Sequence, residues 1–143
     1  MIENKINALF KAYIAAFKQY DITRVANCYA LPCLLSTPDK LLLINNEQQF
    51  TLEFDDIFSQ LQQANTQAFK ITQASYQKLD NHLYLVCIDW AFMNAHQEIF
   101  ADFSAFYTLS LDNGMLQITQ VISHTLEQSK TLTYSLETLV KEY

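Results

Sequence analysis

The second half of the chain alternates hydrophobic and polar residues with a period of two, a pattern that predicts β-strands. Four consecutive antiparallel strands are expected, at residues 69–79, 82–94, 100–111 and 115–125. Tight turns at Asp80-Asn81 and Asn113-Gly114, and a loop around Ala95-His96, separate them. Asn-Gly is the strongest short hairpin signal, because a type I′ turn needs a positive φ at both central residues. We therefore expect one curved sheet.

The turns fix the register of the strands, and the register sorts the side chains onto two faces of the sheet. If Asn113-Gly114 is a two-residue loop, Tyr107 pairs with Gln120 and Phe103 pairs with His124. The more hydrophobic face, which helices should cover, contains Tyr84, Val86, Ile88, Trp90, Phe92, Phe103, Tyr107, Leu109, Ile118 and Ile122. The outer face, expected at solvent or at a subunit interface, contains Thr72, Tyr76, Lys78, Leu85, Cys87, Asp89, Asp102, Ser104, Phe106, Thr108, Thr119, Val121 and Ser123. Trp90 and Phe103 should accordingly be deeply buried.

The first half of the chain has helical periodicity instead. Apolar residues at three- and four-residue spacing predict an amphipathic helix from about Ile2 to Tyr20. Asp21 is a candidate N-cap of a second helix that ends before Pro32, and one face of this helix carries Ile22, Val25, Ala26 and Tyr29. These two segments are expected to form a helical hairpin.

Two short strands and a third helix follow the hairpin. Residues 33–37 and 40–45 have strand character on either side of a Pro38-Asp39 turn. Asn46, with Gln49 three residues later, resembles the capping box of a helix. The buried stripe of this helix is predicted to be Phe50, Phe54, Ile57, Phe58 and Leu61.

The end of the chain again has helical spacing, at Leu132, Leu136, Leu139, Val140 and Tyr143. We expect a short helix that docks on the body of the protein. The 143 residues are interpreted as one domain, because a chain of this length buries roughly two-thirds of the surface that its unfolded form exposes. The predicted domain spans 1–143, with a core at about 6–125 and a C-terminal helical extension at 126–143.

Composition and charge narrow the classes of function. Half of the residues are hydrophobic, and one Gly and two Pro are typical of a compact globular domain rather than a disordered chain. The net charge of −6 and only nine Lys and Arg disfavour nucleic acid, whose phosphates need basic side chains. No apolar run approaches the roughly twenty residues that span a membrane, so we expect no membrane partner. The lone Gly114 belongs to a turn, so a glycine-rich phosphate loop is absent and no cofactor is expected.

The cysteines and the N-terminus indicate a reducing compartment. Cys28, Cys33 and Cys87 are odd in number and lack a Cys-x-x-Cys pair, which argues against a disulfide framework and against a zinc knuckle. Residues 1–10 lack the apolar core and cleavage site of a signal peptide. We therefore expect a cytoplasmic protein. A metal site is not expected, because no ligand spacing connects His82, His96 and His124.

The predicted element order is typical of an α+β fold, in which a curved, mainly antiparallel sheet packs around three N-terminal helices and a short C-terminal helix follows. Tyr13-Ile14-Ala15-Ala16-Phe17, the Val-Ala-x-x-Tyr-Ala ending of the second helix and the closing Asp-Asn-Gly-x-Leu-Gln-Ile strand carry a family resemblance. Through them the chain resembles the superfamily of nuclear transport factor two and ketosteroid isomerase, over about Ile6 to Thr125. The resemblance implies a cone-shaped fold, which polyketide cyclases and scytalone dehydratase also use. It does not imply one activity, because the superfamily contains enzymes, binding modules and partner-docking domains.

The resemblance also implies a pocket between the helices and the concave face of the sheet. Tyr13 matches the position at which ketosteroid isomerases place the tyrosine that donates a hydrogen bond to the substrate's oxyanion. Candidate ligand-binding residues are Tyr13, Tyr29, Tyr84, Trp90, Phe103, Tyr107, Gln120 and His124. A mostly apolar pocket with a few polar groups is the usual form of a small-molecule site, although buried tyrosines also find partners in an ordinary core. We expect a small, largely apolar ligand, bound without catalysis.

Two other functions remain open. A cofactor-independent isomerase, dehydratase or cyclase would use Tyr13 and His124, because the unperturbed pKa of histidine, near 6.5, suits a general base. A protein-interaction module with no cavity is the second alternative.

Asp89 and Asp102 form a possible pair of carboxylates. They would face each other if the loop between their strands is centred between Ala95 and His96, but both belong to the outer face, away from the cone.

Ketosteroid isomerase activity itself is not expected. The reaction needs a carboxylate base, and the family's base position on the short strand corresponds here to Ser36 or Thr37. The family's second oxyanion donor is a buried protonated acid, and the matching region here offers Tyr107 and Thr108. Asp39 could replace the base only if the neighbouring turn folded it inward.

The outer face of the sheet is expected to form a homodimer. Its apolar members have no predicted helix to cover them, and they are Leu85, Cys87, Phe106 and Val121. Exposed apolar patches of this kind usually mark contacts, and members of the family often pair in this way. Phe106→Glu should therefore yield a monomer.

Overall fold

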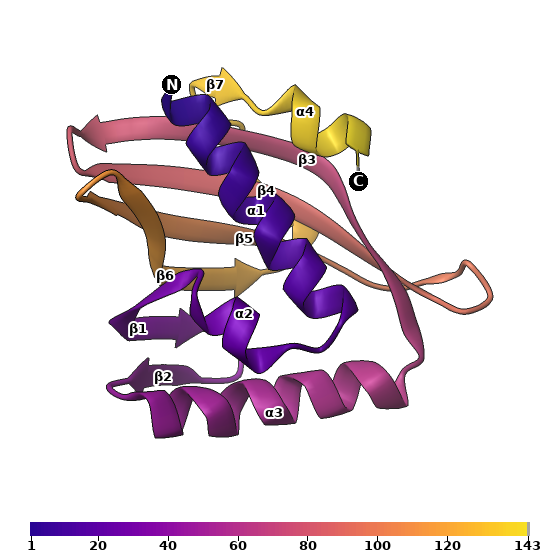
Figure 1. The fold of residues 1–143 in the computed structure, drawn as a ribbon. Coiled ribbons are helices and arrows are strands. Elements are labelled where there is room, and N and C mark those ends of the chain that lie inside the picture. Colours follow the sequence, from indigo (N-terminus) through magenta and orange to yellow (C-terminus); the bar gives the residue numbers. More distant parts are fainter. Residues whose placement is uncertain (143) are drawn as a thin grey trace.

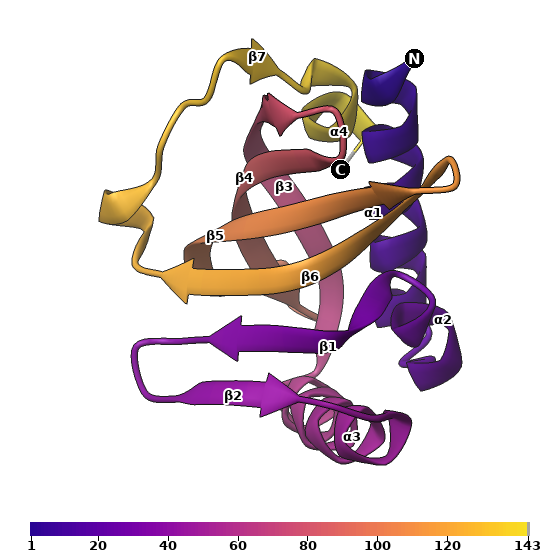
Figure 2. The same ribbon diagram turned by 90° about the vertical axis from the view of Figure 1, so that its left-hand side faces the viewer.

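A curved sheet and the helices on its concave side make up the fold (Figure 1, Figure 2). The computed structural model describes residues 1–142. The described helices are α1 (Ile2–Lys18), α2 (Ile22–Ala26), α3 (Glu47–Gln63), the 3-10 helix η1 (Leu126–Gln128) and α4 (Glu137–Glu142). The strands are β1 (Tyr29–Ser36), β2 (Leu41–Ile44), β3 (Thr66–Asp80), β4 (Leu83–Asn94), β5 (Ile99–Asp112), β6 (Met115–His124) and β7 (Tyr134–Ser135). Their order is β2-β1-β6-β5-β4-β3-β7, with only β1 and β6 parallel, so the predicted α+β cone is confirmed.

Helices α2 and α3 begin at the caps that the sequence predicted. The Asp21 carboxylate accepts a hydrogen bond from the backbone N–H of Arg24 at 3.1 Å. The Asn46 side chain accepts one from the backbone N–H of Gln49 at 2.9 Å. Each cap satisfies an N–H group that the first turn of a helix leaves unpaired. Both α1 and α3 direct their apolar stripes into the cone and bury Ile6, Phe10, Tyr13, Phe17, Phe50, Phe54 and Phe58.

The second helix is shorter than predicted. It ends at Ala26, and Tyr29, which we expected on its buried face, is instead the first residue of β1. The backbone carbonyl of Cys28 accepts a hydrogen bond from the N–H of Ile118 at 2.8 Å. Pairing with β6 thus overrides the helical spacing of this short segment, and the strand still directs Tyr29 into the core.

One extra residue in β6 changes which of its side chains face the cone. Leu109 pairs with Ile118, as the Asn-Gly turn predicts. The next pair joins Thr108 to Gln120, so Thr119 forms a β-bulge. Because side chains alternate along a strand, the predicted register is wrong by one residue beyond the bulge.

The bulge corrects the predicted faces of the sheet. Val121 and Ser123, assigned to the outer face, point toward the inside of the cone. Ile122, assigned to the covered face, is 37% exposed. His124 also lies outside, where its ring is 5.3 Å from the ring of Phe106.

The C-terminal extension crosses the outer face of the sheet, which the sequence predicted to be open (Figure 2). Its chain runs from η1 to β7, which pairs with β3 at the edge of the sheet. The Ser129 hydroxyl donates to the Asp89 carboxylate, with O–O distances of 2.7 and 2.8 Å, and the N–H of Leu132 donates to Ser75 Oγ at 2.9 Å. The residues buried on this face include Ser75, Cys87, Asp89, Ala91 and Ser104.

Asp89 and Asp102 do not form the opposed pair that a turn centred between Ala95 and His96 would give. Asp89 pairs with Ser104, and Asp102 pairs with Ala91. These pairs centre the turn one residue later, where Gln97 has a positive φ of 62°. The two carboxylates are therefore offset along the outer face.

The tail docks as predicted, although its helix is shorter. Leu136 and Leu139 are fully buried, while Leu132 belongs to the extended segment before β7. Tyr143 lies outside the described residues. In the described part of the chain, no helix is both long enough and apolar enough to cross a membrane.

Candidate functional site

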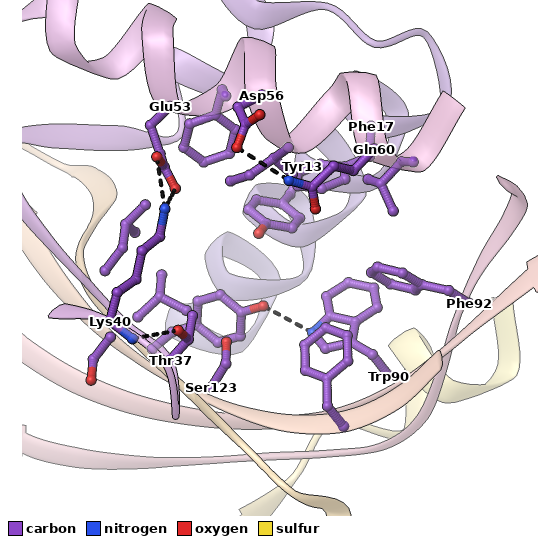
Figure 3. Close-up of a pocket in the computed structure, with 18 of the residues that line it drawn as sticks. Tyr13, Phe17, Thr37, Lys40, Glu53, Asp56, Gln60, Trp90, Phe92 and Ser123 are labelled. Atoms are coloured by element: carbon purple, nitrogen blue, oxygen red, sulfur yellow. Dashed lines mark hydrogen bonds and ion pairs between the residues drawn. The ribbon is translucent and has the colours of Figure 1, made fainter. Parts of the chain in front are cut away.

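A cavity lies inside the cone, between α1, α3 and the concave face of the sheet (Figure 3). Its volume is about 310 Å³. Exposed lining residues from α3 and from the turn between β1 and β2 mark its mouth. The residues that line it are Tyr13, Phe17, Tyr29, Leu35, Ser36, Thr37, Lys40, Glu53, Phe54, Asp56, Ile57, Gln60, Leu61, Trp90, Phe92, Phe103, Tyr107, Val121 and Ser123.

Aromatic rings form most of the inner wall. Tyr13 stacks on Phe17 with ring centroids 4.6 Å apart, and its ring is 6.0 Å from that of Trp90. Phe92 meets Phe103 edge-on at 5.2 Å. Trp90 is 2% exposed, as predicted, whereas Phe103 borders the cavity and is only half-buried. Contacts among rings from helix and sheet hold this apolar wall in place without a ligand.

Three tyrosine hydroxyls and one indole N–H are polar groups of the inner wall. Trp90 Nε1 donates to the Tyr107 hydroxyl oxygen at 2.9 Å. The Tyr13 hydroxyl lies close enough to Tyr29 and Tyr107 to interact electrostatically with both. Burial, reinforced by the neighbouring phenols, raises the pKa of all three tyrosines well above the ordinary value. All three therefore remain protonated at neutral pH and act as hydrogen-bond donors.

The charged side chains of the lining gather at the mouth. Lys40 Nζ lies 2.8 Å from Glu53 Oε2 and 3.1 Å from Glu53 Oε1. This ion pair connects the turn before β2 with α3 across the opening (Figure 3). The hydrogen bond to Glu53 raises the pKa of Lys40. One turn further along α3, Gln60 Nε2 donates to Asp56 Oδ2 at 3.2 Å.

The cavity brings together many of the residues predicted from the sequence. Tyr13, Tyr29, Trp90, Phe103 and Tyr107 all line it, although they come from α1 and three different strands. Periodicity alone sets the inward direction of all of them except Tyr29, whose element was predicted incorrectly.

Three predicted residues lie elsewhere. The bulge at Thr119 turns Gln120 and His124 toward the outer face. Tyr84 is buried in the core but does not touch the cavity. The enzymatic alternative requires Tyr13 and His124 in the same site, and the structure does not bring them together.

The polar residues of the mouth were not among the residues predicted from the sequence. Glu53, Asp56 and Gln60 each precede a residue of the apolar stripe of α3 by one position. Residues spaced by three and four positions share one side of a helix, so a polar line beside the buried stripe was a usable signal. Lys40 had no such signal, because periodicity does not fix the direction of a turn residue.

Two hydroxyl residues of the lining are those that the resemblance matched to the base position of ketosteroid isomerases. Ser36 and Thr37 line the cavity. Thr37 Oγ1 accepts hydrogen bonds from the backbone N–H groups of Asp39 and Lys40, at 3.3 and 3.2 Å. Asp39 itself does not line the cavity and is exposed, so it cannot replace the base. The absence of isomerase activity stays a prediction.

The possible metal ligands are scattered and the cysteines are buried in the described part of the chain. Among residues 1–142, no group of three His, Cys, Asp or Glu side chains is arranged to hold a metal ion. Cys28, Cys33 and Cys87 are free and buried. Burial raises the pKa of Cys28 and of Cys33 to about 11, so both remain neutral thiols at pH 7.

Comparisons with known proteins agree with this architecture. A family model described as NTF2-like protein (DUF6841) matches residues 3–126. No curated protein matches the chain. An NTF2-like protein with a cystatin-like fold from Novosphingobium aromaticivorans has a TM-score of 0.72 at 8% identity, over 88% of this chain and 82% of its own. An NTF2-like protein of unknown function from Shewanella oneidensis MR-1 has a TM-score of 0.65 at 14% identity, over 87% of this chain and 99% of its own.

A third similar structure is a ketosteroid isomerase-like protein from Erwinia carotovora atroseptica. Its TM-score is 0.62 at 17% identity, and the match covers 86% of this chain and 95% of that one. At such low identity these structures share a fold with the chain, and a shared fold does not carry over an activity.

Proposed function

The chain belongs to the NTF2-like family, and we propose that it binds one small, largely apolar molecule in the cavity inside the cone. The observation that carries this proposal is the cavity of about 310 Å³ with aromatic walls and a few convergent hydroxyls. Small-molecule sites usually have this form, with volumes of roughly 300 to 1,000 Å³. A cavity at the lower end of that range suits a compact molecule, such as one or two aromatic rings or a small alicyclic cage.

The hydroxyl cluster supports a ligand that carries a hydrogen-bond acceptor. The indole N–H of Trp90 can only donate, so the Tyr107 oxygen receives it. Tyr107 therefore keeps its own O–H for donation, and the Tyr13 and Tyr29 hydroxyls belong to the same lining. A carbonyl or ether oxygen placed against the cluster would accept a hydrogen bond from one of these O–H groups.

Binding without catalysis and without a cofactor is part of the same proposal. Glu53 is already paired with Lys40 at the mouth, and hydroxyls occupy the position that the resemblance matches to the base of ketosteroid isomerases. Neutral hydroxyls at Ser36 and Thr37 are too weakly basic to remove a proton from carbon at neutral pH. The inner wall therefore offers hydrogen-bond donors but no general base.

Two adjacent residues of β6 test where the ligand binds. Ser123 points into the cavity and Ile122 points away from it, so Ser123→Phe fills the cavity and Ile122→Phe leaves it open. Isothermal titration with neutral one- and two-ring ketones and alcohols should give one site per chain for wild type and for Ile122→Phe. Ser123→Phe should abolish the heat of binding while the circular dichroism spectrum stays native. Failure of every compound to bind wild type, or equal binding to Ser123→Phe, would contradict the proposal.

We also propose that two copies of the chain associate through the uncovered part of the outer face, in the cytoplasm. Val121 points inward and Cys87 is buried, so neither contributes to such a surface. Phe106 pairs with Ile122, which is 37% exposed, and Leu43 on β2 is 55% exposed. These side chains make the remaining outer face apolar enough to support a contact. The three free cysteines suit a reducing compartment.

A further inference from the structure

The mouth of the cavity has an unequal number of positive and negative groups. Its charged lining residues are Lys40, Glu53 and Asp56, so the formal charge there is one negative unit. The Glu53 side chain is only 13% exposed, and Lys40 reaches over it from the solvent side with half of its own side chain exposed. Lys40 is therefore already paired with Glu53, a largely buried carboxylate that has little contact with solvent.

Asp56 retains capacity to accept a new hydrogen bond. Gln60 Nε2 donates to its Oδ2 at 3.2 Å, and an ionised carboxylate accepts several hydrogen bonds on two oxygens. The side chain is close enough to Lys40 to add to the electrostatic stabilisation of that cation. A second cation at the mouth could contact Asp56 without breaking the pair between Lys40 and Glu53.

The aromatic wall also favours a positively charged group over a negatively charged one. The faces of aromatic rings carry partial negative charge and attract cations, and the indole of Trp90 does so best. An anion would meet those faces and the excess carboxylate. At Lys40 it would compete with Glu53 for the same cation and weaken the pair that compensates a largely buried carboxylate.

We propose that the ligand of this cavity is an amphipathic amine, with its apolar body against the aromatic wall and its ammonium group beside Asp56 and Glu53 at the mouth. This inference rests on the proposed function, because it assumes that the cavity binds an apolar molecule at all. It adds the charge of the ligand and assigns Asp56 as the residue that selects for it.

Three probes with the same alicyclic cage test the charge preference. They are 1-adamantanamine, 1-adamantanol and 1-adamantanecarboxylic acid, which do not absorb where tryptophan emits. Trp90 is the single tryptophan of the chain and lines the cavity, so its emission reports occupancy. At low ionic strength the amine should bind about three- to tenfold more tightly than the alcohol, and the acid most weakly. About 0.5 M salt should reduce the amine preference to less than about twofold.

Two variants with the same change in net charge separate the local effect of Asp56 from the electrostatic field of the whole chain. Asp56→Asn should bring the ratio of amine affinity to alcohol affinity close to one. Asp112→Asn, in the hairpin between β5 and β6, should leave the amine preference intact, because Asp112 does not line the cavity.

The outcomes distinguish this inference from the proposed function. Tightest binding of the acid, equal binding of amine and alcohol, or an equal loss in both variants would overturn the preference for an amine. Binding of the alcohol in those cases would still support an apolar ligand in the cavity. If none of the three probes changes Trp90 emission in wild type, both the inference and the proposed function fail.

Discussion

At the scale of single residues, Thr119 determines which side chains of β6 reach the cavity. The Asn-Gly turn correctly predicts the pairs up to Leu109 and Ile118. The bulge at Thr119 then exchanges the inner and outer residues, which places Ser123 inside and His124 outside. No glycine or proline marks this bulge. A β-branched residue in an otherwise regular alternation gives no signal that the register changes, so the sequence could not predict it.

The tyrosine cluster predicts a specific loss of stability at alkaline pH. Burial raises the pKa of Tyr13, Tyr29 and Tyr107 in the folded state above that in the unfolded chain. The unfolded chain then releases protons first, so these groups stabilise the fold fully below about pH 10 and lose that contribution as pH rises further. Each group contributes up to about 1.4 kcal/mol per pH unit to this slope. Urea unfolding between pH 9 and pH 11.5 measures it.

Two variants isolate the contribution of the phenol. Tyr13→Phe removes one titrating group, so its free energy of unfolding should fall less steeply above pH 10 than that of wild type. Phe17→Leu removes a neighbouring cavity-lining ring but no phenol, and should keep the wild-type slope. Identical slopes for wild type and Tyr13→Phe would contradict the assignment of Tyr13 to a buried, protonated cluster.

At the scale of secondary-structure elements, helices and long strands could be predicted, whereas short segments could not. The apolar stripes of α1 and α3 and the caps at Asp21 and Asn46 depend on local spacing, which the sequence contains. Tyr29 belongs to a strand because β6 pairs with it, and that contact is distant in sequence. The crossing of the outer face by residues 126–135 also depends on distant partners, such as Asp89.

The contact between Ser129 and Asp89 should contribute measurably to stability. Ser129→Ala removes the hydroxyl that donates to a carboxylate which is only 6% exposed. A buried acceptor without its partner costs about 1 to 3 kcal/mol, so the free energy of unfolding should decrease by that amount. Ser135→Ala, at an exposed position of β7, should change it by less than about 0.5 kcal/mol. Equal effects of the two substitutions in urea unfolding would show that Ser129 does not anchor the extension.

At the scale of the whole molecule, the extension divides the outer face into a covered part and an open part. The covered part lies over β4 and β3, where Asp89 and Ser75 contact residues 129–132. The open part lies over β6, β1 and the stretch of β5 around Phe106, where Phe106 and Ile122 pair. A second copy of the chain can therefore reach only one side of the outer face.

Sedimentation should find a dimer at micromolar concentration. Phe106→Glu should yield a monomer, because it places a charge in the centre of the open apolar part. Leu79→Glu changes another exposed leucine, which is 49% exposed at the far end of β3, and should leave the dimer intact. A wild-type monomer would refute association through this face, whereas the cavity and its ligand would be unaffected.

The occupancy of the cavity is the claim on which the rest of the account depends, and nuclear Overhauser contacts test it most directly. The chain is mixed with 1-adamantanol, and intermolecular contacts between the cage protons and the aromatic side chains are recorded. The account predicts contacts to the rings of Trp90 and Phe103, which line the cavity, and none to Phe106 on the outer face. Contacts to Phe106 alone, or no contacts at a saturating concentration of the alcohol, would contradict it.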